Sequence, residues 1–229
     1  MGARYFVTGT DTDCGKTTVA AGLLHAARLA GLSTAAVKPV ASGCVAGPDG
    51  LRNADALALL GECSLPLSYA QVNPFAFLPA IAPHVAAQES GQQLTVDALA
   101  DAVRSVLELG AELPIVEGAG GGRGPLGQGV NLSELPRALG LPVILVVGVR
   151  LGCINHAYLS AEAIQRDGLQ LAGWVANIVD PQMSHRDDTL RTLTEGLQAP
   201  CLGTVPNLAH ASPAAVAAHL QLAPLGLAI

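Results

Sequence analysis

The sequence predicts an α/β fold built around a doubly wound, mainly parallel sheet. Strand-like runs alternate with helix-like runs along the whole chain, the pattern of parallel strands joined by helices. The run Ile144–Val147 is continuously apolar, as expected of a central strand buried on both faces. Hydrophobic residues make up 50% of the 229 residues but aromatic residues only 3%. A core of Ala, Val, Leu and Ile therefore follows, which suits a buried parallel sheet.

The elements alternate in order, beginning with the apolar run Tyr5–Val7. Six strands are predicted, over Arg4–Thr8, Thr34–Lys38, Pro114–Glu117, Pro142–Val147, Leu171–Ile178 and Cys201–Val205. The predicted helices are Lys16–Ala30, Ala54–Leu60, Val96–Leu109, Cys153–Arg166, Ser184–Leu197 and Pro213–Leu220. Long irregular loops are predicted over Pro39–Arg52 and Ser64–Leu94, and such loops are often functional. No linker or internal repeat divides the chain, so we expect a single domain over residues 1–229.

Composition argues against several classes of function. The formal net charge is −6, from 12 Lys and Arg against 18 Asp and Glu, and the basic residues do not cluster as a nucleic-acid groove requires. The five cysteines are widely spaced and form no CxxC pair, which argues against a zinc site or a disulfide framework. No apolar run approaches the ~20 residues that span a bilayer, and no signal segment precedes the first strand. We expect a cytoplasmic protein with neither a nucleic-acid nor a membrane partner.

A phosphate-binding loop, Gly9–Thr17 with the sequence GTDTDCGKT, directly follows the first predicted strand. In such a loop, Gly15 lets backbone amides close around phosphate oxygens, Lys16 supplies a positive charge, and the Thr17 hydroxyl ligates magnesium. The helix that starts here adds its N-terminal dipole. The usual pattern has a glycine at the position of Thr10, whereas here the glycine lies one residue earlier, so this is a variant loop. The loop predicts that the chain binds a nucleoside triphosphate.

Two charged residues are predicted at the carboxyl ends of the second and third strands, and ligands of open α/β sheets bind at such ends. Lys38 ends the second strand, as an exposed cap or as a second cation for a transferred phosphoryl group. Glu117 ends the third strand and precedes a glycine-rich segment. A carboxylate there is costly unless it is paired or binds a cation such as magnesium, the alternative being a solvated turn. Asp55 opens a predicted helix, where an acid is ordinarily a partner of the helix dipole.

Two further segments follow later strands. Gly152–Asn155 opens a helix, and the free amides of a helix start bind carboxylates or phosphates. His156 is assigned to the helix surface and is left out of the catalytic set. Asn177 has both an amide donor and a carbonyl acceptor, so it is a candidate for reading a purine edge, with turn formation as the alternative.

Four segments taken together resemble the family of ATP-dependent dethiobiotin synthetases. They are GTDTDCGKT at 9–17, KPVASG at 38–43, VEGAGG at 116–121 and GCINH at 152–156. The resemblance runs from about Arg4 to Pro206, and four motifs in the right order are more specific than a phosphate loop alone. It implies a single P-loop ATP-binding synthetase domain that forms a homodimer with its active site at the interface. The implied reaction turns 7,8-diaminononanoate, CO2 or bicarbonate, and MgATP into dethiobiotin, ADP and phosphate, through a carbamate and a carbamic-phosphoric anhydride.

The resemblance also implies roles for individual residues. The catalytic residues would be Lys38, Lys16 and Thr12. Magnesium would be held by Thr17, Asp55 and Glu117. The substrate would be bound by Ser42 and, from the partner subunit, by Gly152, Cys153, Ile154 and Asn155. The nucleotide would be bound by Asp13, Cys14, Gly15, Lys16, Thr17, Thr18, Glu117, Gly118, Gly120, Asn177, Pro206 and Asn207.

The chain departs from the family pattern in three places. Asp13 stands where some relatives have Glu, which leaves its contact with a ligand open. The stretch Gly122–Gly124 lacks the bulky aromatics of some relatives, and His210–Ala215 has no acid to contact a ribose.

Two other classes of protein compete with this interpretation. A cobyrinate-synthase-type amidating ligase shares the fold, but the chain has no room for its glutamine-hydrolysing domain. A partner-switched ATPase of the septum-positioning or plasmid-partition kind usually has a lysine early in the phosphate loop, where this chain has Thr10–Thr12. The end of the chain, Leu220–Ile229, also lacks the basic amphipathic pattern of a membrane-surface helix.

Overall fold

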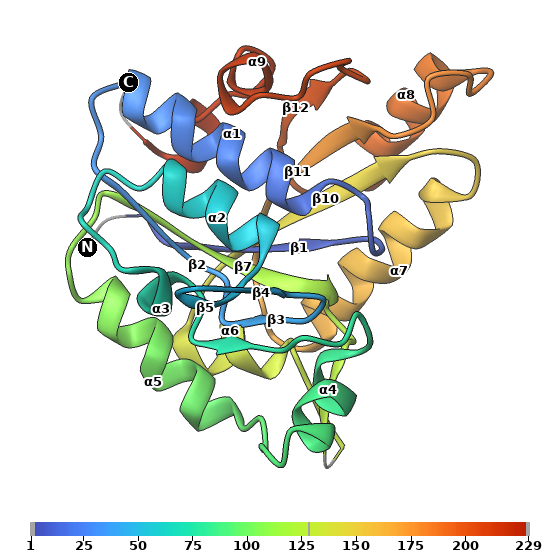
Figure 1. The fold of residues 1–229 in the computed structure, drawn as a ribbon. Coiled ribbons are helices and arrows are strands. Elements are labelled where there is room, and N and C mark those ends of the chain that lie inside the picture. The colour runs from blue at the N-terminus through green and yellow to red at the C-terminus, as the bar shows by residue number, and fades with distance from the viewer. Residues whose placement is uncertain (1–2, 128, 228–229) are drawn as a thin grey trace.

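The centre of the molecule is a six-stranded parallel sheet (Figure 1). The computed structural model describes residues 3–127 and 129–227, so residues 1–2, 128 and 228–229 of the predicted domain lie outside the described residues. The strand order is β12-β11-β10-β1-β7-β2, with β1 inside the sheet and later strands added on both sides of it. This order confirms the doubly wound fold. The strands are β1 Tyr5–Gly9, β2 Thr34–Val37, β7 Leu113–Gly121, β10 Val143–Val149, β11 Leu171–Ile178 and β12 Cys201–Val205.

Helices cover both faces of this sheet, and β10 shows how the sequence achieves it. Ile144 and Val146 pack with Leu23 of α1 on one face, whereas Leu145 and Val147 pack on the other face in the cluster that contains α7. Successive side chains of a strand point to opposite faces, so a continuously apolar strand needs helices on both sides. The helices of the first face are α1 Lys16–Leu29, α2 Ala54–Gly61 and α9 Pro213–Ala217. Those of the second face are α5 Val96–Leu107, α6 Glu134–Leu139, α7 Cys153–Arg166 and α8 Arg186–Gly196.

The helix starts agree with local capping chemistry. Asn53 accepts a hydrogen bond from the Ala56 amide at the start of α2, and Thr95 accepts one from the Ala98 amide at the start of α5. Such caps satisfy backbone donors that have no partner inside the helix. Among residues 3–127 and 129–227, no helix combines the length and apolar character needed to cross a membrane.

The two zones predicted as irregular loops contain short regular elements. Ser68 and Gln71 form a capping box that starts the four-residue helix α3, and this local signal lies in the sequence. The pairing of β3 with β6 joins segments that are distant in the sequence and cannot be read from local periodicity, whereas β4 and β5 form a local antiparallel hairpin. The elements of these zones are β3 Val40–Ala41, β4 Val45–Gly47, β5 Gly50–Arg52, α3 Tyr69–Val72, β6 Phe75–Ala76 and α4 Pro83–Glu89. Also unpredicted are β8 Pro125–Gly127, β9 Val130–Asn131, α6 and the 3-10 helix Ala223–Leu225.

Glu117 does not end its strand, contrary to the prediction. Strand β7 continues to Gly121, which pairs with Gly9 of β1 after a shift in register. A side chain would not fit at the start of this glycine-rich segment, because a Cβ on Gly118 would lie 2.8 Å from Cζ of Phe6. The glycine-rich segment that follows Glu117 therefore begins as part of the central sheet.

This packing predicts opposite effects for two glycine substitutions. Gly118→Ala should lower the free energy of unfolding by about 1–3 kcal/mol, because the added methyl overlaps Phe6. Gly61→Ala, at the end of α2, meets nothing within 4 Å and should raise it by about 0.5–1 kcal/mol. Chemical denaturation of both variants measures these changes. Equal stability of Gly118→Ala and the native protein would contradict the packing account.

Candidate active site

A cavity of about 410 Å³ opens over the phosphate loop and the ends of β2 and β7. Many residues that were predicted from separate segments of the sequence line this one cavity. They are Thr12, Asp13, Gly15, Lys16, Thr17, Thr18, Lys38, Ser42, Asp55, Glu117 and Gly120. The structure thus brings together the phosphate loop, the segment after β2, the start of α2 and the middle of β7.

The conformation of the phosphate loop depends on contacts that only particular residues, such as Gly15 and Lys16, can make. Gly15 has a φ of 93°, and a Cβ there would lie 2.1 Å from Nδ2 of Asn177, so only glycine fits. Asn177 donates a hydrogen bond from Nδ2 to the Cys14 carbonyl at 2.9 Å. The buried Lys16 donates from Nζ to the Asp11 carbonyl at 2.9 Å. These contacts within the protein hold the loop in its closed form without a bound phosphate.

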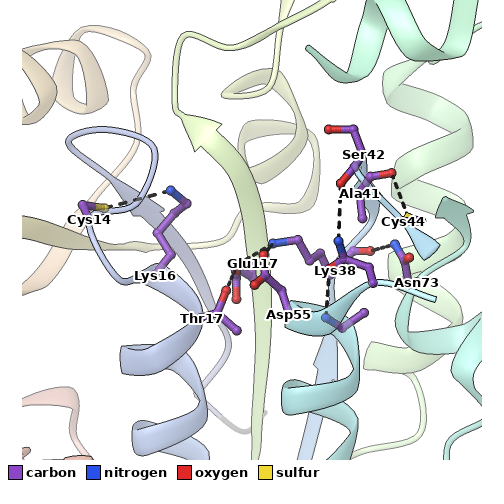
Figure 2. Close-up of polar contacts among 12 residues, drawn as sticks. Cys14, Lys16, Thr17, Lys38, Ala41, Ser42, Cys44, Asp55, Asn73 and Glu117 are labelled. Carbon is purple, nitrogen blue, oxygen red and sulfur yellow. Dashed lines mark hydrogen bonds and ion pairs between the residues drawn. The ribbon is translucent and has the colours of Figure 1, made fainter. Parts of the chain in front are cut away.

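Beside the loop lies a charge cluster made of Thr17, Lys38, Asp55 and Glu117, which Figure 2 shows converging from four segments. Lys38 Nζ lies 2.7 Å from Glu117 Oε1 and 2.6 Å from Asp55 Oδ2. Thr17 donates its hydroxyl hydrogen to the same Glu117 Oε1, at 2.7 Å. One carboxylate oxygen thus joins the phosphate loop to Lys38.

Register and capping place these four side chains. Strands β2 and β7 pair with Val37 opposite Val116, so Lys38 comes directly beside Glu117. Asp55 lies in the first turn of α2, and Thr17 in the first turn of α1. The resulting contact of Asp55 with Lys38 is more specific than the dipole role considered from sequence.

The backbone of Lys38 is fixed by a residue that the sequence analysis missed. Asn73 is buried and donates from Nδ2 to the Lys38 carbonyl at 2.8 Å, while the Lys38 amide donates to the Val72 carbonyl. Its position within a segment predicted to be irregular gave no signal in the sequence.

Burial sets the electrostatics of the charge cluster. The Glu117 side chain has no exposed surface and that of Lys38 is 5% exposed, whereas that of Asp55 is 46% exposed. Burial alone lowers the pKa of Lys38, but the attraction and hydrogen bonds of Glu117 and Asp55 outweigh it, so the pKa lies above its ordinary value. Lys38 is therefore a fully charged cation at neutral pH.

The donor atoms of the charge cluster also fit magnesium. Hydroxyl and carboxylate oxygens are the ligands that this hard cation prefers, and Thr17, Asp55 and Glu117 supply them within one cavity. Glu117 Oε2 is buried and has no hydrogen-bond partner among the described residues, so a cation would compensate it.

A second, larger cavity of about 730 Å³ adjoins the first and shares Thr12, Asp13, Ser42, Ala119 and Gly120 with it. Its outer wall is mostly apolar and comes from the segment before α4 and from the region of β8. The apolar wall residues include Val40, Ile81, Pro83, Leu126 and Leu132. Long loops, which are often functional, were predicted over Pro39–Arg52 and Ser64–Leu94, but none of these wall residues was predicted from the sequence. The site therefore combines a charged half with an apolar half.

Several predicted residues lie outside these two cavities. Gly118 packs against Phe6, and Cys14 of the phosphate loop is buried. Asn207 donates from Nδ2 to the Ile178 carbonyl at 3.3 Å, beside the exposed Pro206. Gly152–Asn155, predicted to bind the substrate, forms the start of α7 and lines neither cavity of this subunit. Their predicted roles toward ligands stay predictions.

Comparison with known proteins points to one family. The AAA domain family profile matches residues 3–215. A Pseudomonas paraeruginosa protein named ATP-dependent dethiobiotin synthetase BioD is 70% identical, and the match covers 98% of this chain and 99% of that protein. A Cellvibrio japonicus protein of the same name is 55% identical, with 96% of each chain covered.

Solved structures support the fold at lower identity. A ParA family ATPase from Chlorobium tepidum has a TM-score of 0.55 at 12% identity, and the match covers 97% of this chain and 92% of that one. The septum site-determining protein MinD from Pyrococcus horikoshii, solved with Mg-ADP, has a TM-score of 0.53 at 18% identity, with coverage of 91% and 82%. At these identities the likeness shows a shared P-loop fold only.

The charge cluster predicts that removing one charge is more costly than removing two. Lys38→Met should lower the free energy of unfolding by about 3–5 kcal/mol near pH 7, because Glu117 is left buried without its counter-charge. Adding Glu117→Gln should restore most of this loss. Urea denaturation of both variants measures the difference.

Lys16→Met is the matched control, since this buried lysine bonds to a carbonyl and not to a carboxylate. It should cost about 1.5–3 kcal/mol, the range of a hydrogen bond to a charged group. A Lys38→Met variant no less stable than Lys16→Met would contradict the proposed charge balance.

Proposed function

The chain belongs to the family of ATP-dependent dethiobiotin synthetases, and from this premise we propose that it forms dethiobiotin from 7,8-diaminononanoate, CO2 and MgATP, releasing ADP and phosphate. The whole chain acts as one ATP-binding synthetase domain. The observation that carries the proposal is the direct link between the phosphate loop and a second buried lysine: Thr17 and Lys38 both bind Glu117 Oε1.

The proposed reaction has three bond-forming steps. One amine of the substrate attacks CO2 and loses a proton, which gives a carbamate. A carbamate oxygen then attacks the γ-phosphorus of ATP, ADP leaves, and a carbamic-phosphoric anhydride forms. The second amine attacks the carbonyl carbon of this anhydride, phosphate leaves, and loss of a proton completes the ureido ring. The substrate supplies its own nucleophiles, so the protein must chiefly position the reactants and stabilise charge.

The charged half of the site suits this task. Lys16 and Lys38 would surround the transferred phosphoryl group, and Thr12 at the junction of the two cavities would face the carbamate. Thr17, Asp55 and Glu117 would hold Mg²⁺. When bound, Mg²⁺ neutralises charge on the phosphate oxygens.

The nucleotide would lie along the phosphate loop, with its phosphates on Asp13, Cys14, Gly15 and Thr18 and beside Gly118 and Gly120. Asn177 donates one amide hydrogen to the Cys14 carbonyl. Its Oδ1 and its second amide hydrogen are left to contact the base. Pro206 and Asn207 would flank the base.

The apolar half of the site suits the alkyl chain of the diamine. Ser42 lies where the two cavities meet, close to Lys38 along the chain, and would contact the reacting end of the substrate. The chain would then run along the apolar wall that contains Ile81 and Leu126. The distal carboxylate would bind at the start of the 14-residue helix α7, whose first amides, Gly152–Asn155, point beyond the helix.

We place that helix start in the site of a partner subunit, so that two chains form a homodimer with shared sites. Gly152–Asn155 lines neither cavity of its own subunit. Next to it, Leu151 is 90% exposed, and Leu159 on the same helix is 55% exposed. Large exposed apolar side chains beside a candidate binding segment are consistent with an interface.

The proposed reaction predicts that ADP release depends on both other substrates. The purified protein should release ADP rapidly only when diaminononanoate and bicarbonate are both present, because the phosphoryl acceptor is the carbamate that they form. Coupled ADP detection with mass spectrometry of the product measures this. Equal ATP hydrolysis without the diamine, and no ureido product, would exclude the synthetase function.

Shared sites predict rescue in mixed dimers. Lys16→Gln and Asn155→Ala homodimers should both be nearly inactive, whereas exchanged heterodimers should regain activity, because one of their two sites has neither substitution. Activity after subunit exchange is the measurement, with Lys16→Gln mixed with Lys38→Gln as the control that gives no intact site. No rescue in confirmed heterodimers would contradict the shared site.

A further inference from the structure

The phosphate loop is attached to the end of β10 by a series of contacts that lead toward α7. The Thr10 amide donates to the Val146 carbonyl at 3.0 Å, and the Gly148 amide donates to Thr10 Oγ1 at 3.3 Å. A Cβ on Gly148 would lie 2.9 Å from Cβ of Cys14, so loop and strand touch there. Because β10 leads directly into α7, the loop and the helix start share one support.

The series ends in an ion pair between Asp11 of the loop and Arg150, the residue after β10. Asp11 uses three groups at once. One carboxylate oxygen contacts Arg150, the other accepts the Thr12 amide hydrogen at 2.8 Å, and the Asp11 carbonyl accepts from Lys16 Nζ. Asp11 therefore joins two proposed catalytic residues to Arg150.

Arg150 is also joined to the start of α7. The Cys153 amide donates to the Arg150 carbonyl at 3.0 Å, and the N-cap residue Gly152 has a φ of 93° that shapes the turn between them. The side chain of Arg150 thus faces the loop while its carbonyl holds the first turn of the helix. A shift of Asp11 would be passed to this turn through a single residue.

We propose that Asp11 and Arg150 are a positioning pair, through which a nucleotide bound to the phosphate loop orders the helix start Gly152–Asn155. Neither residue lines the two cavities, so neither is a catalytic residue. That this helix start binds substrate rests on the proposed function, but the ordering by nucleotide does not.

The exposure of the pair favours a coupling role over a large contribution to stability. The side chains of Arg150 and Asp11 are 42% and 41% exposed, so water and salt screen their attraction. Such a pair forms fully only when its two segments are already close. A phosphate bound to the amides of the already closed loop would hold Asp11 in place beside Arg150 and so supply this condition.

Hydrogen exchange of residues 151–157 tests the proposal without substrate. Saturating Mg·ADP should slow exchange of this segment about two- to five-fold in the native protein, the range expected of one exposed ion pair. Arg150→Gln should remove this slowing, and Arg150→Lys should keep part of it. Asp11→Asn should also remove it, while its side-chain oxygen still accepts from Thr12. The ADP affinity of each variant is measured first, so that every comparison is made at saturation.

Arg123→Gln is the matched control, because Arg123 pairs with Asp167 at the opposite end of α7 with a distance of 2.8 Å. It should leave the ADP-dependent slowing unchanged. The proposal is overturned if Mg·ADP does not slow exchange in the native protein, if Arg150→Gln retains the native slowing, or if Arg123→Gln loses as much.

A kinetic readout then addresses the substrate role separately. Arg150→Gln should raise the KM for the diamine more than the KM for ATP, and Arg150→Lys should partly reverse this. Lost ordering with unchanged diamine KM would keep the positioning pair and remove only the assigned substrate segment.

Discussion

The Glu117 carboxylate lies inside the central sheet with no exposed surface, and its charge constrains what surrounds it. A buried carboxylate must be paired or hydrogen-bonded, and here Lys38 and Thr17 share one of its oxygens. Thr17 can do so only because the phosphate loop ends there, and Lys38 only because β2 pairs with β7 in the observed register. The phosphate loop, the second lysine and the start of α2 are thereby fixed around one group.

The site depends on these particular residues around Glu117, so a shared fold does not by itself determine the function. MinD and ParA structures share the P-loop architecture at 18% and 12% identity, and partition-type ATPases were one alternative for this sequence. The two dethiobiotin synthetases compared above match over nearly the whole chain at 70% and 55% identity. Chemistry on a shared fold resides in the site, and here the site adds an apolar cavity and a buried lysine to the phosphate loop.

Sequence reasoning predicted what depends on local pattern and missed what depends on distant contacts. The six central strands, the phosphate loop and the placement of Lys38 and Glu117 near strand ends followed from periodicity, motif and the strand-end rule, whereas Asp55 was grouped with them only through the family resemblance. The extension of β7 to Gly121 was missed, because a run of glycines is typical of a loop. Only the pairing of Gly121 with Gly9 in the folded chain shows that the segment is a strand. Asn73 and the apolar wall around Ile81 lie in segments without periodicity, so only the folded chain shows their place. Arg150 stands at a strand end and the same rule would have found it.

The central claim is that the charge cluster and the phosphate loop form one site for phosphoryl transfer. The most direct test is a crystal structure of the protein with Mg²⁺ and a non-hydrolysable ATP analogue. The account predicts that the metal has Thr17 and Glu117 oxygens as ligands or as partners of its bound waters, and that Lys38 Nζ lies within hydrogen-bond distance of the γ-phosphate. A metal bound away from Glu117, or a γ-phosphate that points away from Lys38, would contradict it.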